Sequence, residues 1–170
     1  VRLMTSLLFT GEEKELAKPG VIKEIYDPAC GTGGMLTVSK DYIQTHFNKD
    51  ANIFLYGQEL NESTYAICKA DMLIKGEDID YIKGGDKEHA KASTLSNDQH
   101  HGKKFDYILS NPPFGVSWEK DKTKVVEESE RGFSGRFGAG LPRISDAQFL
   151  FMLEGTHFLR HIVHGSIDIA

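Results

Sequence analysis

The 170-residue chain is predicted to form an α/β fold with a mostly parallel sheet and flanking helices, because strand and helix patterns alternate along it. A short strand predicted at 21–27 leads into a glycine-rich loop at 28–34, and apolar residues then recur at helical spacing over 35–47. The pattern repeats with a strand at 52–59 and a helix at 61–76. Parallel strands joined in this way imply right-handed crossovers, and the length suits a single domain.

The termini of two helices can also be predicted. Residues 10–20 form a polar connector after a short N-terminal helix, and the helix that follows the second strand has Asn61 as its expected N-cap and Gly76 as its expected C-cap. The N-terminal helix, residues 1–9, is predicted from apolar residues that share one of its faces: Val1, Leu3 or Met4, Leu7 and Leu8.

The middle of the chain is less regular. Residues 81–84 are a weak strand candidate, and the polar stretch 87–104 shows no recognisable element. The apolar run 105–110 is the strongest strand of the chain, and its composition predicts a central place in the sheet.

The last part of the chain begins with a charged, glycine-rich stretch, residues 119–143, which we expect to form a long mobile loop. Helical spacing returns over 146–162, and a strand then begins at 166–170. Because the chain starts with a valine and stops within this strand, we expect that both ends were cut from a longer protein.

Composition and charge restrict the classes of partner. The chain has a formal net charge of -5 and a pI near 5.8, whereas a protein that binds nucleic acid by itself usually has a basic face. We therefore expect it to hold DNA poorly without a partner. A membrane span and a secretory signal are not indicated, so the expected location is the cytoplasm. Cys30 and Cys68 lack the spacing of a disulfide framework or a zinc site, so we expect reduced thiols and no metal.

The stretch DPACGTGG, residues 27–34, combines an acid at a strand end with the glycines Gly31, Gly33 and Gly34. Glycines let the backbone approach a ligand closely, and the helix that follows presents unpaired N–H groups. The spacing differs from that of a dinucleotide site, and a nucleotide-like ligand without pyrophosphate would fit. Asp27 would place negative charge near such a ligand if the ligand is cationic. The alternative is a plain tight turn.

Glu59 ends the second predicted strand. In doubly wound folds an acid at this position accepts hydrogen bonds from ribose hydroxyls, because the second strand overlooks the same crevice as the first. A solvated acid at a strand end is the alternative. Together, the glycine loop and Glu59 favour a ligand that contains adenosine.

The stretch ILSNPPFGVSW, residues 108–118, places Asn111, Pro112, Pro113 and Phe114 directly after the strongest strand. The prolines remove two N–H donors and fix the backbone, so this segment offers hydrogen-bond acceptors that suit an amino group. Such a grip would turn the nitrogen lone pair toward an electrophilic carbon. Stacking on the aromatic ring contributes about 1 to 3 kcal/mol, which offsets the few kcal/mol that extrusion of a base costs. The alternative is a turn with the ring in the core.

Methylation at a ring carbon of cytosine is not expected, because it would require a cysteine nucleophile where this chain has Pro113. Cys30 belongs to the glycine loop and is interpreted as a small loop residue.

Other conspicuous residues have structural interpretations. His100 and His101 lie in a polar stretch and are expected to be solvated. Trp118 either lines the DNA side of the site or packs on the neighbouring loop. An acidic run is expected to form an exposed face: Glu127, Glu128 and Glu130.

Four segments, DPACGTGG, GQELN, FDYILSNPPFGVSW and RFGAGLPRISDAQFLF, closely resemble the modification (M) subunit of type I restriction-modification systems. Members of this family are adenine-specific DNA methyltransferases that use S-adenosylmethionine. The resemblance covers nearly the whole chain. It implies a Rossmann-like S-adenosylmethionine-dependent methyltransferase fold, of which residues 1–170 form part of the catalytic domain, without the last strands or the N-terminal helical domain.

The resemblance also implies roles for individual residues. Ser93 stands where many relatives place an aspartate that contacts the adenine of the cofactor. Glu59 would bind the ribose. The methionine part of the cofactor would be cradled by Asp27, Gly31, Thr32, Gly33 and Gly34, and the target adenine would be held by Asn111, Pro112, Pro113 and Phe114.

By the same resemblance, the parent protein would read DNA through a specificity (S) subunit, pair with a second M subunit and associate with restriction (R) subunits. Two other functions stay open from the residues alone. One is amino-methylation of a protein glutamine or of ribosomal RNA, since the NPPF motif also occurs in those enzymes. The other is a catalytically silent module that binds cofactor or serves assembly.

Overall fold

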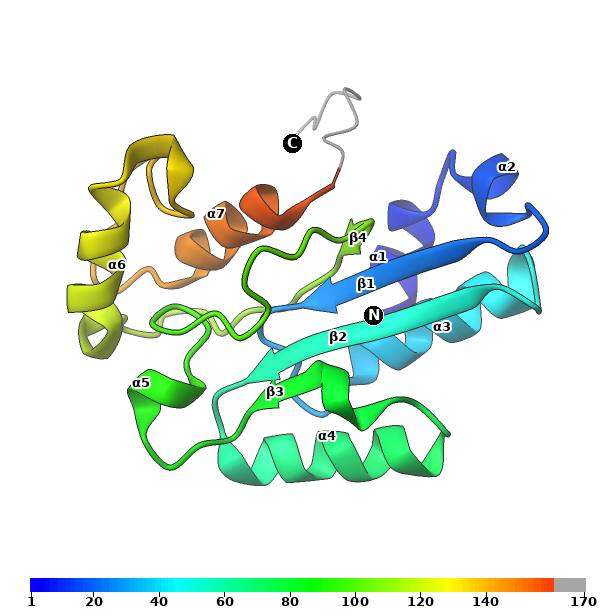
Figure 1. Ribbon diagram of the computed structural model, residues 1–170, viewed down its shortest axis with the longest axis horizontal. Helices are drawn as coiled ribbons and strands as arrows, with labels where there is room; N and C mark the ends of the chain where they lie inside the picture. The colour runs from blue at the N-terminus through cyan, green and yellow to red at the C-terminus, as the bar shows by residue number, and fades with distance from the viewer. Residues whose placement is uncertain (161–170) are drawn as a thin grey trace.

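A computed structural model describes residues 1–160, so the strand expected at 166–170 lies outside the described part of the chain. The centre of the molecule is a sheet of four parallel strands in the order β3-β2-β1-β4 (Figure 1). The predicted α/β fold with a parallel sheet and flanking helices is confirmed. The strands are β1 Ile22–Asp27, β2 Asn52–Glu59, β3 Ile82–Gly84 and β4 Tyr107–Ile108.

The strand register brings the carboxyl ends of the strands to one edge of the sheet. Asp27, the last residue of β1, is paired with Gly57, and β2 continues to Glu59. In Figure 1 the arrowheads of β1 and β2 point toward the side where α5 (His89–Ala92) and α6 (Lys122–Ser129) lie. The loops that leave the strands at this edge therefore share one region of the molecule.

One face of the sheet carries the main core. It is covered by α1 (Arg2–Leu8), α3 (Gly34–His46) and α4 (Glu62–Ile74), and the short α2 (Glu13–Leu16) adds one buried leucine. Each large aliphatic side chain buried there contributes about 1.5 to 3 kcal/mol. The largest members of this core include Phe9, Leu16, Ile25, Leu36, Ile43, Leu55, Met72 and Ile82.

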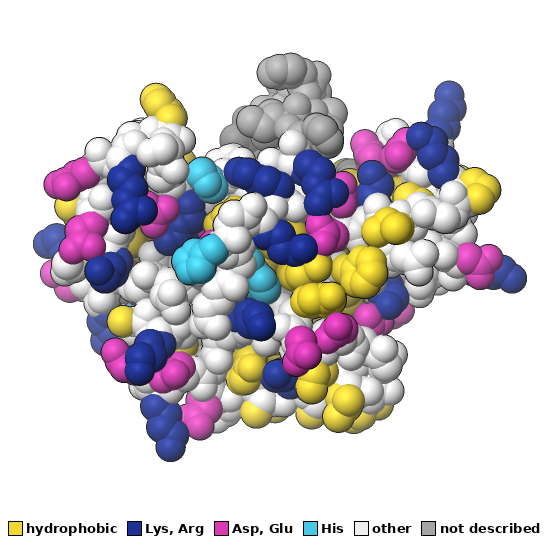
Figure 2. Space-filling view, viewed as in Figure 1, with side chains coloured by type: hydrophobic (Ala, Val, Ile, Leu, Met, Phe, Trp, Pro, Cys, Tyr) yellow, Lys and Arg dark blue, Asp and Glu magenta, His cyan; other side chains and the backbone are white. Residues whose placement is uncertain are grey.

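The opposite face is covered only in part. Phe158 of α7 (Gln148–Phe158) packs there with Tyr26 of β1, Tyr56 of β2 and Phe105. Near the amino ends of the strands this face is open, and Figure 2 shows hydrophobic side chains over β1 and β2. Exposed apolar residues of these two strands are Ile22 and Phe54.

The strand predicted at 105–110 does not take the central place in the sheet that we expected. Within residues 1–160, β4 is the outermost of the four strands and not a central one. On its outer side a parallel bridge joins Phe105 to Leu159, where the Phe105 N–H donates to the Phe158 carbonyl at 2.9 Å. Among residues 1–160, this run is buried by β1 on one side, by α7 and by the bridge to Leu159.

The helix predicted at the N-terminus is confirmed as α1, but much of the apolar face from which it was predicted is exposed. Helix α1 forms, but the side chains of Leu3 and Leu7 are 72% and 66% exposed. The helix is anchored through Thr5 and the following Phe9, which are fully buried. The Thr5 hydroxyl donates to the Val1 carbonyl at 3.1 Å, and this local hydrogen bond lets a polar residue occupy the buried face.

Residues 119–143 contain helices and are not the long loop that we expected. The stretch holds η2 (Glu119–Asp121), α6 and η3 (Gly132–Ser134). The polar stretch 87–104 likewise contains the short helix α5. Few apolar residues in these stretches are buried, so the helical spacing of apolar residues was too weak to predict the helices. Those that are buried form a third hydrophobic cluster together with residues of neighbouring segments. Its buried members are Leu95, Trp118, Val125, Phe137, Ala147 and Leu150.

The helix ends around α4 follow the prediction closely. The Asn61 side chain accepts a hydrogen bond from the Thr64 N–H at 2.9 Å, so Asn61 is the N-cap. At the other end Lys75 is the C-cap, and Gly76 lies one residue beyond it with a φ of 73°. The glycine therefore occupies the left-handed position that ends many helices.

The glycine loop meets α3 at a position that only glycine fits. Gly33 has a φ of 83° and is the N-cap of α3. A Cβ atom there would lie 2.7 Å from Met72 Cε and 2.9 Å from Cys68 Sγ, both on α4. Gly34, the first residue of α3, has ordinary helical backbone, and a Cβ atom at this residue would have nothing within 4 Å. The loop therefore fixes the distance between α3 and α4 at Gly33.

We expect Gly33→Ala to lower the free energy of unfolding by about 2 to 3 kcal/mol, because it combines a left-handed backbone with overpacking against α4. Gly34→Ala is the matched control and should leave stability unchanged or raise it slightly, since alanine favours a helix. Urea denaturation of both variants and the wild type measures the difference. Equal stability of the two variants would contradict the role given to Gly33.

Candidate functional site

A cavity of about 320 Å³ opens at the carboxyl edge of the sheet. Its lining comes from the start of the glycine loop, the end of β2, α5 and the loop after it, the segment after β4, and the first part of α7 with the residue before it. A mostly apolar wall with a few convergent polar groups is typical of small-molecule sites. Polar lining residues include Glu59, Ser93 and Asn111, and apolar ones include Leu60, Leu95, Pro113, Trp118 and Phe151.

The cavity brings together predicted site residues that are far apart in the sequence. Glu59, Asn111 and Pro113 line it, and Pro28 and Ala29 represent the glycine loop on the same wall. The Phe114 side chain is 76% exposed and therefore does not belong to the core. The predicted residues that do not line the cavity are Asp27, Gly31, Thr32, Gly33, Gly34, Pro112 and Phe114.

Asp27 is a buried carboxyl group at the end of β1. Its Oδ1 accepts a hydrogen bond from the Ala29 N–H at 3.0 Å, while its Oδ2 is buried and has no partner among the described residues. Burial raises the pKa of Asp27 to about 7, and the neighbouring Ser110 hydroxyl and Ala29 N–H oppose this shift. Asp27 can therefore exist in either protonation state near neutral pH, and a nearby positive charge would favour the ionised form.

Glu59 joins the end of β2 to the glycine loop. Its Oε2 accepts a hydrogen bond from the Gly31 N–H at 2.8 Å, and its Oε1 accepts one from the Asn61 N–H at 2.7 Å. Each carboxylate oxygen keeps a further lone pair that can accept a hydrogen bond. The carboxylate is thus held in place before any ligand arrives, with capacity left for a hydroxyl donor in the cavity.

Sequence reasoning missed Gln58, which is fully buried in β2. Its Nε2 donates to the carbonyls of Ala92 and Asn97 at 3.0 and 2.8 Å, and its Oε1 accepts from the Gln99 N–H at 3.1 Å. One side chain therefore anchors both ends of the loop that carries Ser93. A glutamine inside an otherwise apolar strand end was the signal that could have revealed it, since a buried amide needs partners.

The loop after α5 is also fixed to the glycine loop. The Thr94 hydroxyl donates to the Pro28 carbonyl at 2.7 Å. Thr94 and its neighbours Ser93 and Leu95 line the cavity, so the position expected to contact an adenine ring does lie on the cavity wall. No charged group occupies that position, because serine stands there.

A polar cluster on the cavity wall was also missed. His89 Nε2 lies 3.0 Å from an oxygen of the buried Asp121 carboxylate, and the Ser96 hydroxyl donates to the same carboxylate. Trp118, for which two interpretations stayed open, is buried and donates from Nε1 to the Arg143 carbonyl at 2.9 Å. It packs in the third cluster and also forms part of the wall.

Two structural expectations were wrong. His100 is buried, since its ring packs among Tyr26, Tyr56 and Phe105, and burial lowers its pKa. Glu128 is half-buried in an ion pair and is not part of an exposed acidic face. In both cases the surrounding stretch looked polar, and the side chains that contact the residue come from outside that stretch: aromatic rings of β1, β2 and Phe105 for His100, and Arg136 for Glu128.

The described residues also limit other kinds of site. Within residues 1–160, no group of three or more His, Cys, Asp or Glu side chains is placed to hold a metal ion. None of the helices within these residues combines the length and the apolar character that crossing a membrane requires. Cys30 and Cys68 are buried free thiols, and Cys30 packs against the backbone of Gly57.

Comparison with known proteins gives one family match, to N-6 DNA methylases over residues 2–167. The methylase subunit of the type I restriction enzyme HindI from Haemophilus influenzae is 36% identical over 139 residues, which is 81% of this chain and 28% of that protein. The MjaVII methylase subunit from Methanocaldococcus jannaschii is 27% identical over 99% of this chain and 26% of its own length. The chain thus spans about a quarter of these curated relatives.

Solved structures show the same fold. A type I restriction-modification methyltransferase subunit from Streptococcus thermophilus matches with a TM-score of 0.66 and 28% identity, covering 94% of this chain and 30% of that one. A class I S-adenosylmethionine-dependent methyltransferase from Listeria monocytogenes matches with a TM-score of 0.65 and 16% identity, covering 94% and 42%. The second likeness bears on the fold alone.

We expect the buried Asp27 to make stability depend on pH in a defined window. The native state keeps its proton up to about pH 7, whereas the unfolded chain loses it near pH 4, so Asp27 lowers the free energy of unfolding as the pH rises between these values. The stability of Asp27→Asn relative to the wild type should increase from about pH 4 to about pH 7 and stay constant above. Urea denaturation across this range measures it, and a flat difference would contradict the buried, protonated carboxyl.

Proposed function

The chain belongs to the N-6 DNA methylase family, and we propose that the protein carrying it transfers the methyl group of S-adenosylmethionine to the exocyclic amino group of adenine in DNA. One observation supports this most: a single cavity is lined by Glu59 from the end of β2 and by Asn111 and Pro113 from the segment after β4. The residue proposed to bind the ribose and the residues proposed to hold the amine therefore line the same cavity.

The residues present fit the proposed cofactor. S-adenosylmethionine supplies an electrophilic methyl group on a positively charged sulfur. Asp27 has a buried carboxylate oxygen without a partner among the described residues, and its negative form would be favoured by a cation nearby. Glu59 is held by two N–H groups and retains lone pairs for ribose hydroxyls. The apolar wall of Leu60 and Leu95 suits a planar ring.

The segment after β4 would hold the target base. Asn111 has an exposed side chain on the cavity wall, and the two prolines that follow have no N–H to donate. The acceptors of this segment would take the two hydrogens of an exocyclic amine and direct its lone pair into the cavity. Activation of the amine then comes from positioning, and a general base with a matched pKa is not required.

Phe114 would stack on a base that has left the duplex. Its ring is 76% exposed directly after the acceptor segment. Nothing in the described structure buries it, so its apolar surface is available to a planar partner. Stacking of this kind helps to offset the cost of extruding the base.

The wider assembly is part of the same proposal. The names of the relatives place them in type I restriction enzymes, and we propose that this protein acts as the modification subunit of such a complex in the cytoplasm. DNA would be read through a specificity subunit, with a second modification subunit and restriction subunits in the full complex. A net charge of -5 agrees with DNA binding that depends on a partner.

We expect Asn111→Ala to lower kcat for transfer of labelled methyl groups to DNA by at least about 100-fold, because the amine would lose its side-chain acceptor. The measurement uses the full-length protein with its specificity subunit. Asn52→Ala is the control, since Asn52 is exposed at the opposite end of β2. Equal activity of Asn111→Ala and the wild type would refute the role of Asn111, and transfer to a protein glutamine or to ribosomal RNA instead of DNA would refute the substrate.

We expect Phe114→Ala to raise the KM for DNA by roughly 5- to 150-fold, which corresponds to the loss of about 1 to 3 kcal/mol of base stacking. Phe133→Ala is a matched control, because Phe133 is 89% exposed and lies outside the cavity lining. Steady-state kinetics with varied DNA measures both variants. A similar change in the two variants would show that Phe114 contributes only general surface hydrophobicity.

A further inference from the structure

Arg136 is a buried arginine in the segment between η3 and α7. Its Nη1 donates to the Thr94 carbonyl at 2.6 Å, and its Nη2 donates to the Leu95 carbonyl at 3.1 Å. Both carbonyls belong to the loop that lines the cavity. The guanidinium therefore contacts the backbone of the cavity wall without itself lining the cavity.

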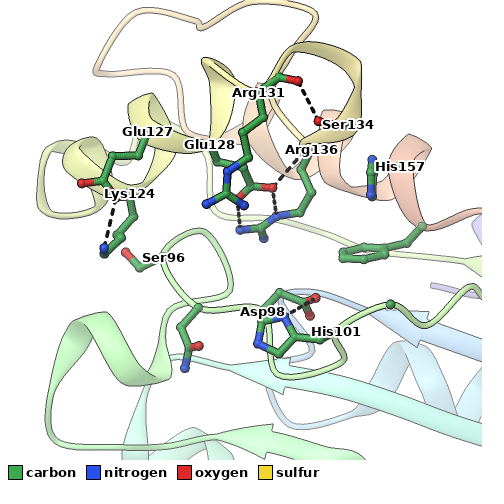
Figure 3. A pocket seen from close by; sticks show the side chains of 13 residues that line it. Ser96, Asp98, His101, Lys124, Glu127, Glu128, Arg131, Ser134, Arg136 and His157 are labelled. Carbon is green, nitrogen blue, oxygen red and sulfur yellow. Dashed lines mark hydrogen bonds and ion pairs between the residues drawn. The ribbon is translucent and has the colours of Figure 1, made fainter.

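The guanidinium is itself fixed by two acids. Glu128 of α6 accepts from Arg136 Nε at 2.9 Å and from Nη2 at 2.7 Å, in the paired geometry that arginine and a carboxylate favour. Figure 3 shows these contacts as dashed lines, within a second hollow of about 420 Å³ on the far side of the loop. Glu154 of α7 lies farther away, with its Oε1 at 3.5 Å from Nη1. Arg136 thus joins α6, α7 and the loop.

Thr94 is held from two directions by these contacts. Its hydroxyl donates to the Pro28 carbonyl of the glycine loop at 2.7 Å, and its own carbonyl accepts from Arg136 at 2.6 Å. Ser93 and Leu95 lie on either side of Thr94 and line the cavity, so these contacts also fix their positions. The distance between the glycine loop and this wall is therefore set by Arg136 and Pro28 together.

We propose that Arg136 is a positioning residue that sets the affinity of the cavity for the cofactor, by holding the 93–95 wall at the correct distance from the glycine loop. This inference rests on the proposed function. Arg136 does not contact the cavity itself, so it acts through the loop and not on the reacting atoms. The segment RFGAG, which contains Arg136, would then serve cofactor binding although it lies far from the glycine loop in the sequence.

Lysine cannot replace arginine in this role. The contacts require a planar group that reaches two carbonyls and both oxygens of one carboxylate, whereas an ammonium group is a point charge with three donors. Arg136→Lys keeps the positive charge near Glu128 and so limits the damage to folding. Arg131→Lys is the matched control, because Arg131 is exposed, borders the same hollow and makes no side-chain hydrogen bond in the described residues.

The test uses the full-length protein with its specificity subunit, methyl transfer kinetics with varied S-adenosylmethionine, and calorimetry of S-adenosylmethionine binding. We expect Arg136→Lys to raise both the KM and the Kd for S-adenosylmethionine about tenfold, equivalent to about 1.4 kcal/mol. At saturating S-adenosylmethionine, kcat and the KM for DNA should stay within about threefold of wild type. Arg131→Lys should match the wild type in every measurement. Thermal melting without cofactor reports any loss of folded protein.

The outcomes separate this inference from the function on which it rests. An unchanged Kd for S-adenosylmethionine in Arg136→Lys, with wild-type binding intact, would overturn the positioning role and leave the proposed function standing. A fall in kcat with no change in KM or Kd would also overturn it, since loss of folded enzyme alone gives that pattern. If the wild type binds no S-adenosylmethionine, the proposed function and this inference both fail.

Discussion

The loops at the carboxyl edge of the sheet have backbone groups that no ladder or helix satisfies, and side chains supply the missing partners. Gln58 serves three backbone groups, Glu59 serves two and Arg136 serves two more. A buried backbone group without a partner costs about as much as a lost hydrogen bond, so these residues are needed for the loops to pack at all. The same hydrogen bonds fix the positions of the loops that line the cavity, so they also determine its shape.

The groups available for chemistry are those that the loops do not use. Asp27 Oδ2 is left without a partner in the described structure, and the acceptor segment after β4 is exposed to the cavity and to solvent. Asp27 Oδ2 is buried outside the cavity lining, whereas Asn111 faces the mostly apolar cavity wall. Gln58 therefore has its bonds taken up within the loops, whereas Asp27 Oδ2 and Asn111 keep free hydrogen-bonding capacity in the described structure.

Sequence reasoning reached the parallel sheet, the glycine loop, the caps of α4 and the shared cavity of Glu59 and Asn111, because each depends on local residue types or on strand order. It failed where burial depends on partners outside the local pattern. Glu128 looked like part of a solvated acidic run, but it is half-buried and pairs with Arg136 from the segment after η3. Leu3 and Leu7 of α1 show the converse, since apolar spacing predicted the helix correctly although the described chain leaves these two side chains exposed.

The ion pair between Glu128 and Arg136 has a consequence for recombination between related enzymes. Glu128 precedes η3 and Arg136 follows it, so a crossover within Gly132–Ser134 would combine the acid of one parent with the base of another. A chimaera that lacked either residue would leave the other without its paired hydrogen bonds beside the loop, which is more costly than a missing surface contact. Segments exchanged between relatives to alter substrate preference should therefore include residues 128–136 from a single parent.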